Sequence, residues 1–260
     1  MKRRTLLAAA LTAPFTAARA DTPALLPVLT YHRFDPEHST SGTIITTKVF
    51  AAQMRYLADQ KITVAKLHDA LSVAHGAPLS DPTVTITADD GWRTVYTHMF
   101  PIIREHRFPV TLFLNPPQIG AGAYLTWKMI AEMQETGLFD IQAHSMTHPN
   151  FNTERARRSP AAYAEFVEQE LKGCLKPIAE HTGTAPDLLA WPFGIHDAQL
   201  EQAAQAAGYK AAFALGSRPI QNGDPDFALP RAQIYDTDTP QRFAWIVAGH
   251  ARQSLKKVSS

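Results

Sequence analysis

The chain has 260 residues, of which 45% are hydrophobic and 19% are charged, and its formal net charge is +1. This length suffices for one large α/β domain with a sizeable core, or for two small domains. The near-balance of charge gives no reason to expect a nucleic-acid partner. The only cysteine is Cys174, which excludes an internal disulfide, and its helical spacing from Leu171 and Ile178 predicts a place in the core.

Residues 1–20 have the features of a secretory signal peptide. A basic start with Arg3 and Arg4 precedes a short apolar stretch and a small-x-small cleavage site that ends at Ala20. The apolar part is too short to span a bilayer, although a membrane anchor or an ordinary helix is the alternative. We therefore expect residues 21–260 to be one mature domain without a transmembrane segment, periplasmic or secreted. The export route, Sec or twin-arginine, is left open.

From about Leu25 onward, short β-rich runs alternate with amphipathic helical patterns. In chain order, strands are expected at 27–32, 83–88, 109–114, 139–145, 188–194, 209–215 and 227–234. Helices are expected at 47–60, 92–106 (kinked or restarted at Pro101), 126–137, 160–182, 197–207 and 239–253. This alternation predicts a mainly parallel sheet wrapped by helices, and seven or so repeats favour a closed barrel over an open sheet.

Polar residues stand at or just past the carboxyl ends of five of the expected strands. In parallel α/β barrels that face of the barrel holds the chemistry, so we expect these side chains to meet in one site. They are His32, Asp89 with Asp90, His144, the segment 191–194, and Arg231.

Two of these clusters complement each other chemically. Asp89 and Asp90 end the apolar run TVTITADDG, and His144 and His148 follow in AHSMTH. Two imidazoles and one carboxylate form a three-residue ligand set for a divalent metal, which leaves the other aspartate free to take a proton from water. Taken alone, Asp-Asp-Gly is also good turn chemistry. The spacing of four predicts a single helical turn that brings the two histidines to one face.

Three motifs, in this order and spacing, resemble those of the NodB-homology polysaccharide deacetylases, the family 4 carbohydrate esterases. The family pattern Thr-Phe-Asp-Asp-Gly is matched by residues 87–91 with Ala88 in place of the usual Phe, and His-Ser/Thr-x-x-His is matched by residues 144–148. The third motif is WPFG at 191–194. The fold implied by the resemblance is a single-domain, distorted (β/α)7 barrel, and the likeness extends over most of residues 27–235.

The resemblance also implies roles for the site residues. By it, Asp89 is the catalytic base, while Asp90, His144 and His148 bind the metal. The metal expected is zinc, with cobalt, nickel or iron as alternatives, because two imidazoles and one carboxylate suit all four.

The opening VLTYHRF and the phrase AWPFG are similar to the exported branch of the family that deacetylates poly-β-1,6-N-acetylglucosamine. In that branch the order of motifs looks circularly permuted, so that His32 becomes the candidate general acid. A structural histidine, hydrogen-bonded beneath the site, is the alternative for His32. The third motif here lacks the arginine that orients the base in the usual family member. Arg231 could supply that charge, and otherwise it forms a surface salt bridge.

The remaining candidates concern the substrate. Backbone N–H groups around Phe193 and Gly194 are expected to donate to a developing oxyanion. The aromatic rings of Trp92, Trp191 and Phe193 are candidate sugar contacts, with a place in the core as the alternative.

The expected function is therefore metal-dependent removal of N-acetyl groups from N-acetylglucosamine residues of an exported polysaccharide, with release of acetate. The alternatives are an esterase or deacetylase for xylan, peptidoglycan or chitin oligomers, a cyclic-amide hydrolase, or a non-catalytic carbohydrate-binding module.

Overall fold

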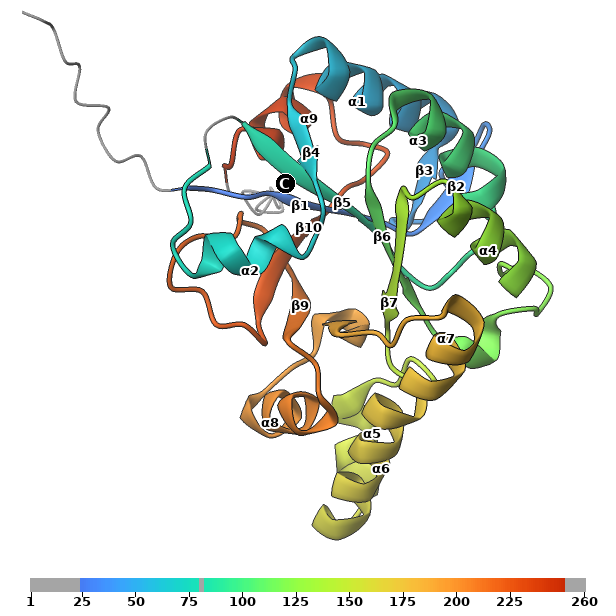
Figure 1. Ribbon diagram of the computed structural model, residues 1–260, viewed down its shortest axis with the longest axis vertical. Coiled ribbons are helices and arrows are strands. Elements are labelled where there is room, and N and C mark those ends of the chain that lie inside the picture. The colour runs from blue at the N-terminus through green and yellow to red at the C-terminus, as the bar shows by residue number, and fades with distance from the viewer. Residues whose placement is uncertain (1–23, 80–81, 251–260) are drawn as a thin grey trace, which may run out of the picture.

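A computed structural model of the chain describes residues 24–79 and 82–250, so the expected signal peptide lies outside the described residues. Seven parallel strands close into a barrel in the order β1-β10-β9-β8-β7-β6-β5, and β5 pairs again with β1 (Figure 1). This confirms the (β/α)7 architecture expected from the sequence. The barrel strands are β1 Val28–Tyr31, β5 Thr83–Ala88, β6 Val110–Leu114, β7 Phe139–Ala143, β8 Leu188–Ala190, β9 Ala211–Gly216 and β10 Leu229–Gln233.

Three further strands were not predicted. β4 (Thr63–Ala65) pairs with the first half of β5, outside the ring of seven. β2 (Arg33–Asp35) and β3 (Ile44–Thr46) form a separate two-stranded sheet. Each is three residues long, which is too short to show a period of two in the sequence.

The expected helices are present with two informative differences, and two further α-helices, α2 (Asp69–Ala74) and α5 (Phe151–Arg157), were not predicted. Expected helix 160–182 is divided at Cys174, because Pro177 has no N–H to continue the ladder of α6. Expected helix 92–106 begins as the π-helix η1 and continues as α3, whose second residue is Pro101. The helices are α1 Thr47–Asp59, α2 Asp69–Ala74, η1 Val95–Met99, α3 Phe100–His106, η2 Pro116–Gln118, α4 Trp127–Glu135, α5 Phe151–Arg157, α6 Pro160–Gly173, α7 Leu175–Thr182, η3 Pro192–Gly194, α8 Ala198–Ala207 and α9 Pro240–Val247.

Two layers of apolar packing hold the barrel together. Along β5, Val84, Ile86 and Ala88 belong to the larger cluster between strands and helices, as does Cys174. Inside the barrel a smaller cluster of aliphatic and aromatic side chains includes residues of α2. His68, just before α2, hydrogen-bonds Asp187 ahead of β8 (2.8 Å), so α2 lies at the N-terminal end of the barrel. The polar residues at the carboxyl ends of the strands lie at the opposite end of the barrel.

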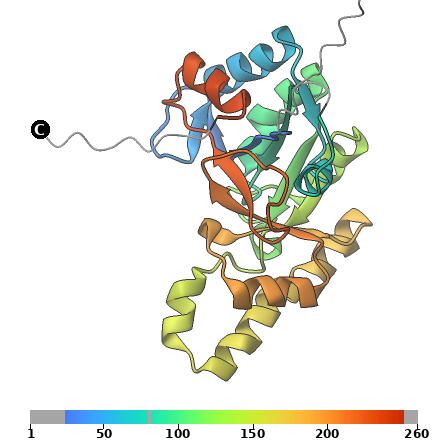
Figure 2. The ribbon, with the colours of Figure 1, turned by 90° about the vertical axis from the view of Figure 1, so that its left-hand side faces the viewer.

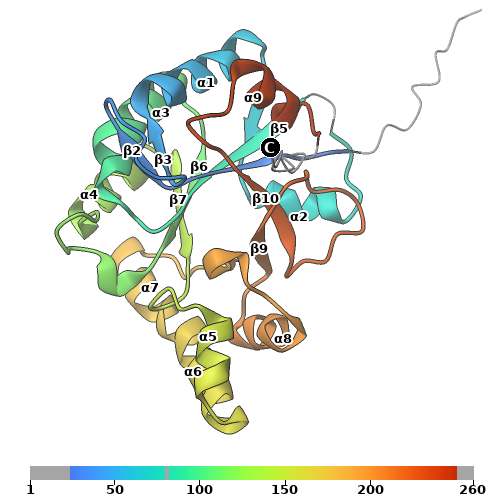
Figure 3. The ribbon, with the colours of Figure 1, turned by 180° about the vertical axis from the view of Figure 1, so that it is seen from behind.

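Helices extend the barrel on two sides. α5 and α6 project away from the strands, as two views at right angles show (Figures 1 and 2). α9 lies beside α1, where the Phe243 and Tyr56 rings are 5.8 Å apart (Figure 3). Among the residues that the structure describes, no helix combines the length and the apolar run needed to cross a bilayer.

Candidate active site

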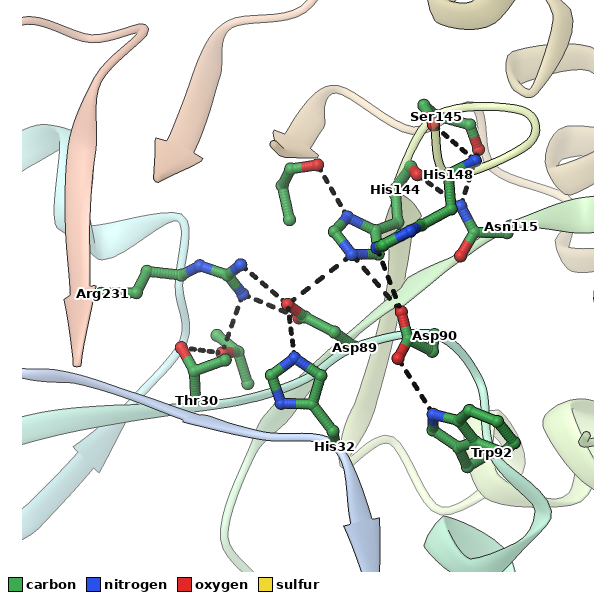
Figure 4. A network of polar contacts seen from close by, with 12 residues as sticks. Thr30, His32, Asp89, Asp90, Trp92, Asn115, His144, Ser145, His148 and Arg231 are labelled. Atoms are coloured by element: carbon green, nitrogen blue, oxygen red, sulfur yellow. Dashed lines mark hydrogen bonds and ion pairs between the residues drawn. The ribbon is translucent and has the colours of Figure 1, made fainter. Parts of the chain in front are cut away.

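The two aspartates reach one site because the chain turns sharply where β5 ends. Asp90 and Gly91 both have left-handed φ angles, 70° and 74°. A side chain at Gly91 would also be strained sterically, since its Cβ would lie 2.8 Å from Leu114 Cδ2. Both carboxylates consequently join one polar network at the carboxyl ends of the strands (Figure 4). The Asp-Asp-Gly segment thus forms a turn and also contributes both of its carboxylates to the site.

The histidine pair is held by an irregular loop and not by the helical turn that the spacing predicted. Ser145 and His148 both adopt left-handed φ values, 63° and 57°, which rules out a helix between them. The His148 N–H donates to Ser145 Oγ at 3.1 Å. The rings still meet, with centroids 4.7 Å apart. Non-glycine residues in this conformation are strained, and such strain concentrates at functional sites.

Two buried residues that the sequence reasoning missed hold this loop. Asn115, at the end of β6, donates its side-chain amide to the carbonyls of His144 and Ser145. Glu170 of α6 accepts hydrogen bonds from the Thr147 N–H (2.8 Å) and hydroxyl (2.6 Å). Glu170 is 23 residues from Thr147, and no periodic signal could have connected them.

Removing the Glu170 carboxylate should therefore loosen the loop. In Glu170→Ala the N–H and hydroxyl of Thr147 lose two hydrogen bonds to a buried, charged acceptor, which should cost about 1–3 kcal/mol of unfolding free energy in urea titrations. Glu168→Ala on the same helix removes only an exposed pair with Lys172, and should leave stability unchanged. Equal stability of the two variants would contradict this role of Glu170.

Asp90, His144 and His148 offer three ligand atoms that all lie within 4.8 Å of one another. Asp90 Oδ1 lies 3.5 Å from His144 Nε2 and 3.6 Å from His148 Nε2. Ligands about 2.1 Å from a tetrahedral zinc ion are roughly 3.4 Å apart, so the spacing fits one ion.

The protonation state of His144 also fits a cation at this point. Its Nδ1 lies 2.7 Å from the Ala190 carbonyl, which can only accept, so the proton is on Nδ1 and the lone pair is on Nε2. Burial lowers the pKa of His144 to about 4, so the ring is neutral at pH 7. The Nε2 lone pair and the Asp90 carboxylate oxygen then face each other without a hydrogen between them, an arrangement that a metal ion would stabilise.

Asp89 forms the second part of the site through Arg231. The guanidinium of Arg231 is fully buried and contacts both carboxylate oxygens of Asp89, at 2.7 and 2.8 Å. This is a bidentate pair inside the barrel, not the surface salt bridge that was the alternative. Burial by itself would raise the pKa of Asp89, but Arg231, with His144 and His32, holds that pKa well below its ordinary value. Asp89 is therefore ionised.

His32 lies at the junction of β1 and β2 with its ring largely buried. Its Nε2 is 3.8 Å from Asp89 Oδ2, the same distance at which His144 Nε2 approaches that oxygen. His32 thus borders the space beside Asp89 (Figure 4).

The structure corrects two expectations about the third motif. Trp191 is not a sugar contact, because its side chain is fully buried and its Nε1–H donates to the Phe227 carbonyl at 2.9 Å. The Gly194 N–H already donates to the Trp191 carbonyl at 2.9 Å, so it is not available to an oxyanion.

Phe193 behaves differently from its neighbours. It has a left-handed φ of 57°, its side chain is 57% exposed, and its ring packs edge-on against His148 with centroids 4.6 Å apart. No described residue accepts a hydrogen bond from its backbone N–H. Phe193 therefore offers both a ring and a donor at the rim of the site.

The structure is a closed parallel barrel whose C-terminal mouth carries three residues that could hold a metal ion, beside a carboxylate paired with an arginine. Comparison with known proteins identifies the family. The family model for polysaccharide deacetylases matches residues 76–212. That range exceeds half of the chain and includes the Asp-Asp-Gly, His-x-x-x-His and Trp-Pro-Phe-Gly motifs. The chain belongs to the polysaccharide deacetylase family, and it is a hydrolase.

Relatives and solved structures agree with this assignment. The chain is 21% identical to the poly-β-1,6-N-acetyl-D-glucosamine N-deacetylase of Staphylococcus aureus over 74% of its own length and 68% of that protein. Its fold is similar to IcaB from Ammonifex degensii, with a TM-score of 0.74 and 23% identity over 86% of this chain and 96% of that one. It is also similar to the deacetylase PplD of Streptococcus pyogenes, with a TM-score of 0.77 and 19% identity over 87% and 99%.

Proposed function

We propose that this protein removes N-acetyl groups from N-acetylglucosamine residues of an exported polysaccharide, poly-β-1,6-N-acetylglucosamine, in a metal-dependent reaction. The observation that carries the proposal is the convergence of Asp90, His144 and His148 beside the paired carboxylate of Asp89. The similarity to the S. aureus enzyme that is named for this polymer supports the choice of substrate. A signal peptide at residues 1–20 and a periplasmic or secreted location belong to the same proposal.

Asp90, His144 and His148 would hold the divalent ion, with zinc as the metal proposed. When bound, the ion supplies Lewis acidity that polarises the acetamide carbonyl and makes water a better nucleophile. Cobalt, nickel and iron remain alternatives because they accept the same ligands.

The residues around the ion divide the proton transfers between them. Asp89 is the general base that takes a proton from the attacking water, and Arg231 is a positioning residue that fixes the Asp89 carboxylate from behind. The Phe193 N–H donates to the developing oxyanion. His32 delivers a proton to the departing amine, after which acetate and the free amino sugar leave. The exposed Phe193 ring and Trp92 border the sugar.

Metal removal should abolish acetate release from β-1,6-linked oligomers, and stoichiometric zinc should restore it. His148→Ala should weaken zinc binding by more than about 100-fold, because losing a ligand costs more than the 10–100-fold of an outer-shell change. His75→Ala is the matched control, since His75 is a surface residue that pairs with Asp226. Full activity in the presence of a chelator would contradict the metal-dependent reaction.

The same measurements separate the alternatives. Acetate release from acetylated xylan, peptidoglycan or chitin oligomers in preference to β-1,6-oligomers would favour a different polymer. Sugar binding without acetate release from any of them would favour a carbohydrate-binding module.

A further inference from the structure

The two oxygens of the Asp90 carboxylate have different partners. Oδ1 is the oxygen that faces His144 Nε2 and His148 Nε2. Oδ2 points the other way and accepts a hydrogen bond of 2.9 Å from the Trp92 indole Nε1–H (Figure 4). An indole N–H can only donate, so this contact identifies Oδ2 as the acceptor in any protonation state of the histidines.

The indole itself is held in place by neighbours outside the ligand set. The Tyr124 ring stacks on it with centroids 4.4 Å apart and planes 20° apart, and the Arg33 guanidinium lies 4.3 Å from its centroid. The backbones of Trp92 and Tyr124 also form an isolated β-bridge. The ring therefore has little freedom to turn away from Asp90.

We propose that Trp92 is a positioning residue that holds Asp90 in the monodentate mode of metal binding, an inference that rests on the metal site of the proposed function. With Oδ2 engaged by the indole, only Oδ1 is offered to the ion. A single carboxylate oxygen and two imidazole nitrogens occupy three positions and leave the others to water and substrate, as catalysis requires. Without the indole N–H, Asp90 can rotate about its side-chain bonds or bind through both oxygens.

The test is Trp92→Phe, which keeps an aromatic ring for the Tyr124 stack and removes the N–H. Zinc and cobalt are titrated by calorimetry into the metal-free protein, and the Co²⁺ absorption spectrum is recorded. The Kd should rise 10–100-fold, the range for lost outer-shell partners, and the Co²⁺ bands should change because they report coordination number and geometry. Trp127→Phe is the matched control, because Trp127 stacks on His181 of α7 and makes no contact with the ligand set; it should bind both metals normally.

A second measurement does not depend on the variant folding. The wild-type chain has four tryptophans, so its indole N–H signals are few enough to resolve by NMR. One signal, assigned to Trp92 by the substitution or by elimination of the other three, should exchange slowly with solvent and shift when zinc binds. A freely exchanging Trp92 N–H, or a Trp92→Phe variant with wild-type Kd and Co²⁺ spectrum, overturns the proposal. Tight zinc binding by a wild-type protein that releases no acetate would refute the proposed reaction and leave this inference standing.

Discussion

Asp89→Asn is expected to lower kcat for acetate release by about 10²–10⁴-fold while the zinc content stays near one ion per chain. The amide cannot accept a proton from water at neutral pH, so the contribution of general base catalysis is lost. The ligand set is preserved, because the Asp90 oxygen and the two His Nε2 atoms are separate from Asp89. Steady-state kinetics and elemental analysis of the same preparation measure both quantities.

The control for Asp89→Asn is the apparent stability of the variant. Arg231 keeps an amide oxygen as acceptor but loses its counter-charge, so some loss of Tm is expected and the assay is run well below that temperature. Asp90→Asn provides the contrast, since it should lose zinc along with activity. If Asp89→Asn lost zinc to the same degree, the division between base and ligand would be wrong.

Arg231→Met is expected to have the largest effect on stability, about 3–5 kcal/mol of unfolding free energy. The substitution leaves the Asp89 carboxylate buried without its partner, and an uncompensated buried charge is costly. The pKa of Asp89 should rise once the guanidinium is gone, since burial then dominates. Urea unfolding of the metal-free protein measures the free energy, and acetate release measures the loss of orientation of the base.

The same substitution at a more exposed pair is the matched control. Arg155 pairs with Asp197 where both side chains are partly exposed, and Arg155→Met should cost roughly 1 kcal/mol or less. The double variant Asp89→Asn/Arg231→Met should be more stable than the sum of the single changes predicts, because the two residues form one pair. Additive effects would mean that Asp89 and Arg231 act separately.

The pairing of Asp89 and Arg231 shows where sequence reasoning reached its limit. The two residues are 142 positions apart, and Arg231 lies within a strand whose pattern equally allowed a surface role. Closure of the barrel brings β10 next to β1 and β1 next to β5, which turns Arg231 inward beneath the end of β5. The residue pattern around Arg231 does not indicate which strands become its neighbours when the sheet closes.

Positions at strand ends were more predictable than contacts across the site. All seven barrel strands were expected from short β-rich runs, and parallel strands present their carboxyl ends on the same side, so His32, Asp89, Asp90 and His144 could be assigned to one mouth of the barrel. The loop from His144 to His148 was expected as a helical turn, because a spacing of four is ambiguous without knowledge of backbone dihedrals. Trp191 was a candidate sugar contact with a place in the core as the alternative, and residue type alone could not decide between the two.

The amino-acid sequence alone determined the alternation of strands and helices, the family motifs and the identity of the candidate ligands, since these depend on residue type and on spacing along the chain. Only the tertiary structure decided which carboxylate pairs with Arg231, how Asn115 and Glu170 hold the histidine loop, and which Asp90 oxygen faces the two histidines. These contacts join segments that become neighbours only when the barrel closes, and their energies depend on burial and direction, which a linear sequence does not contain.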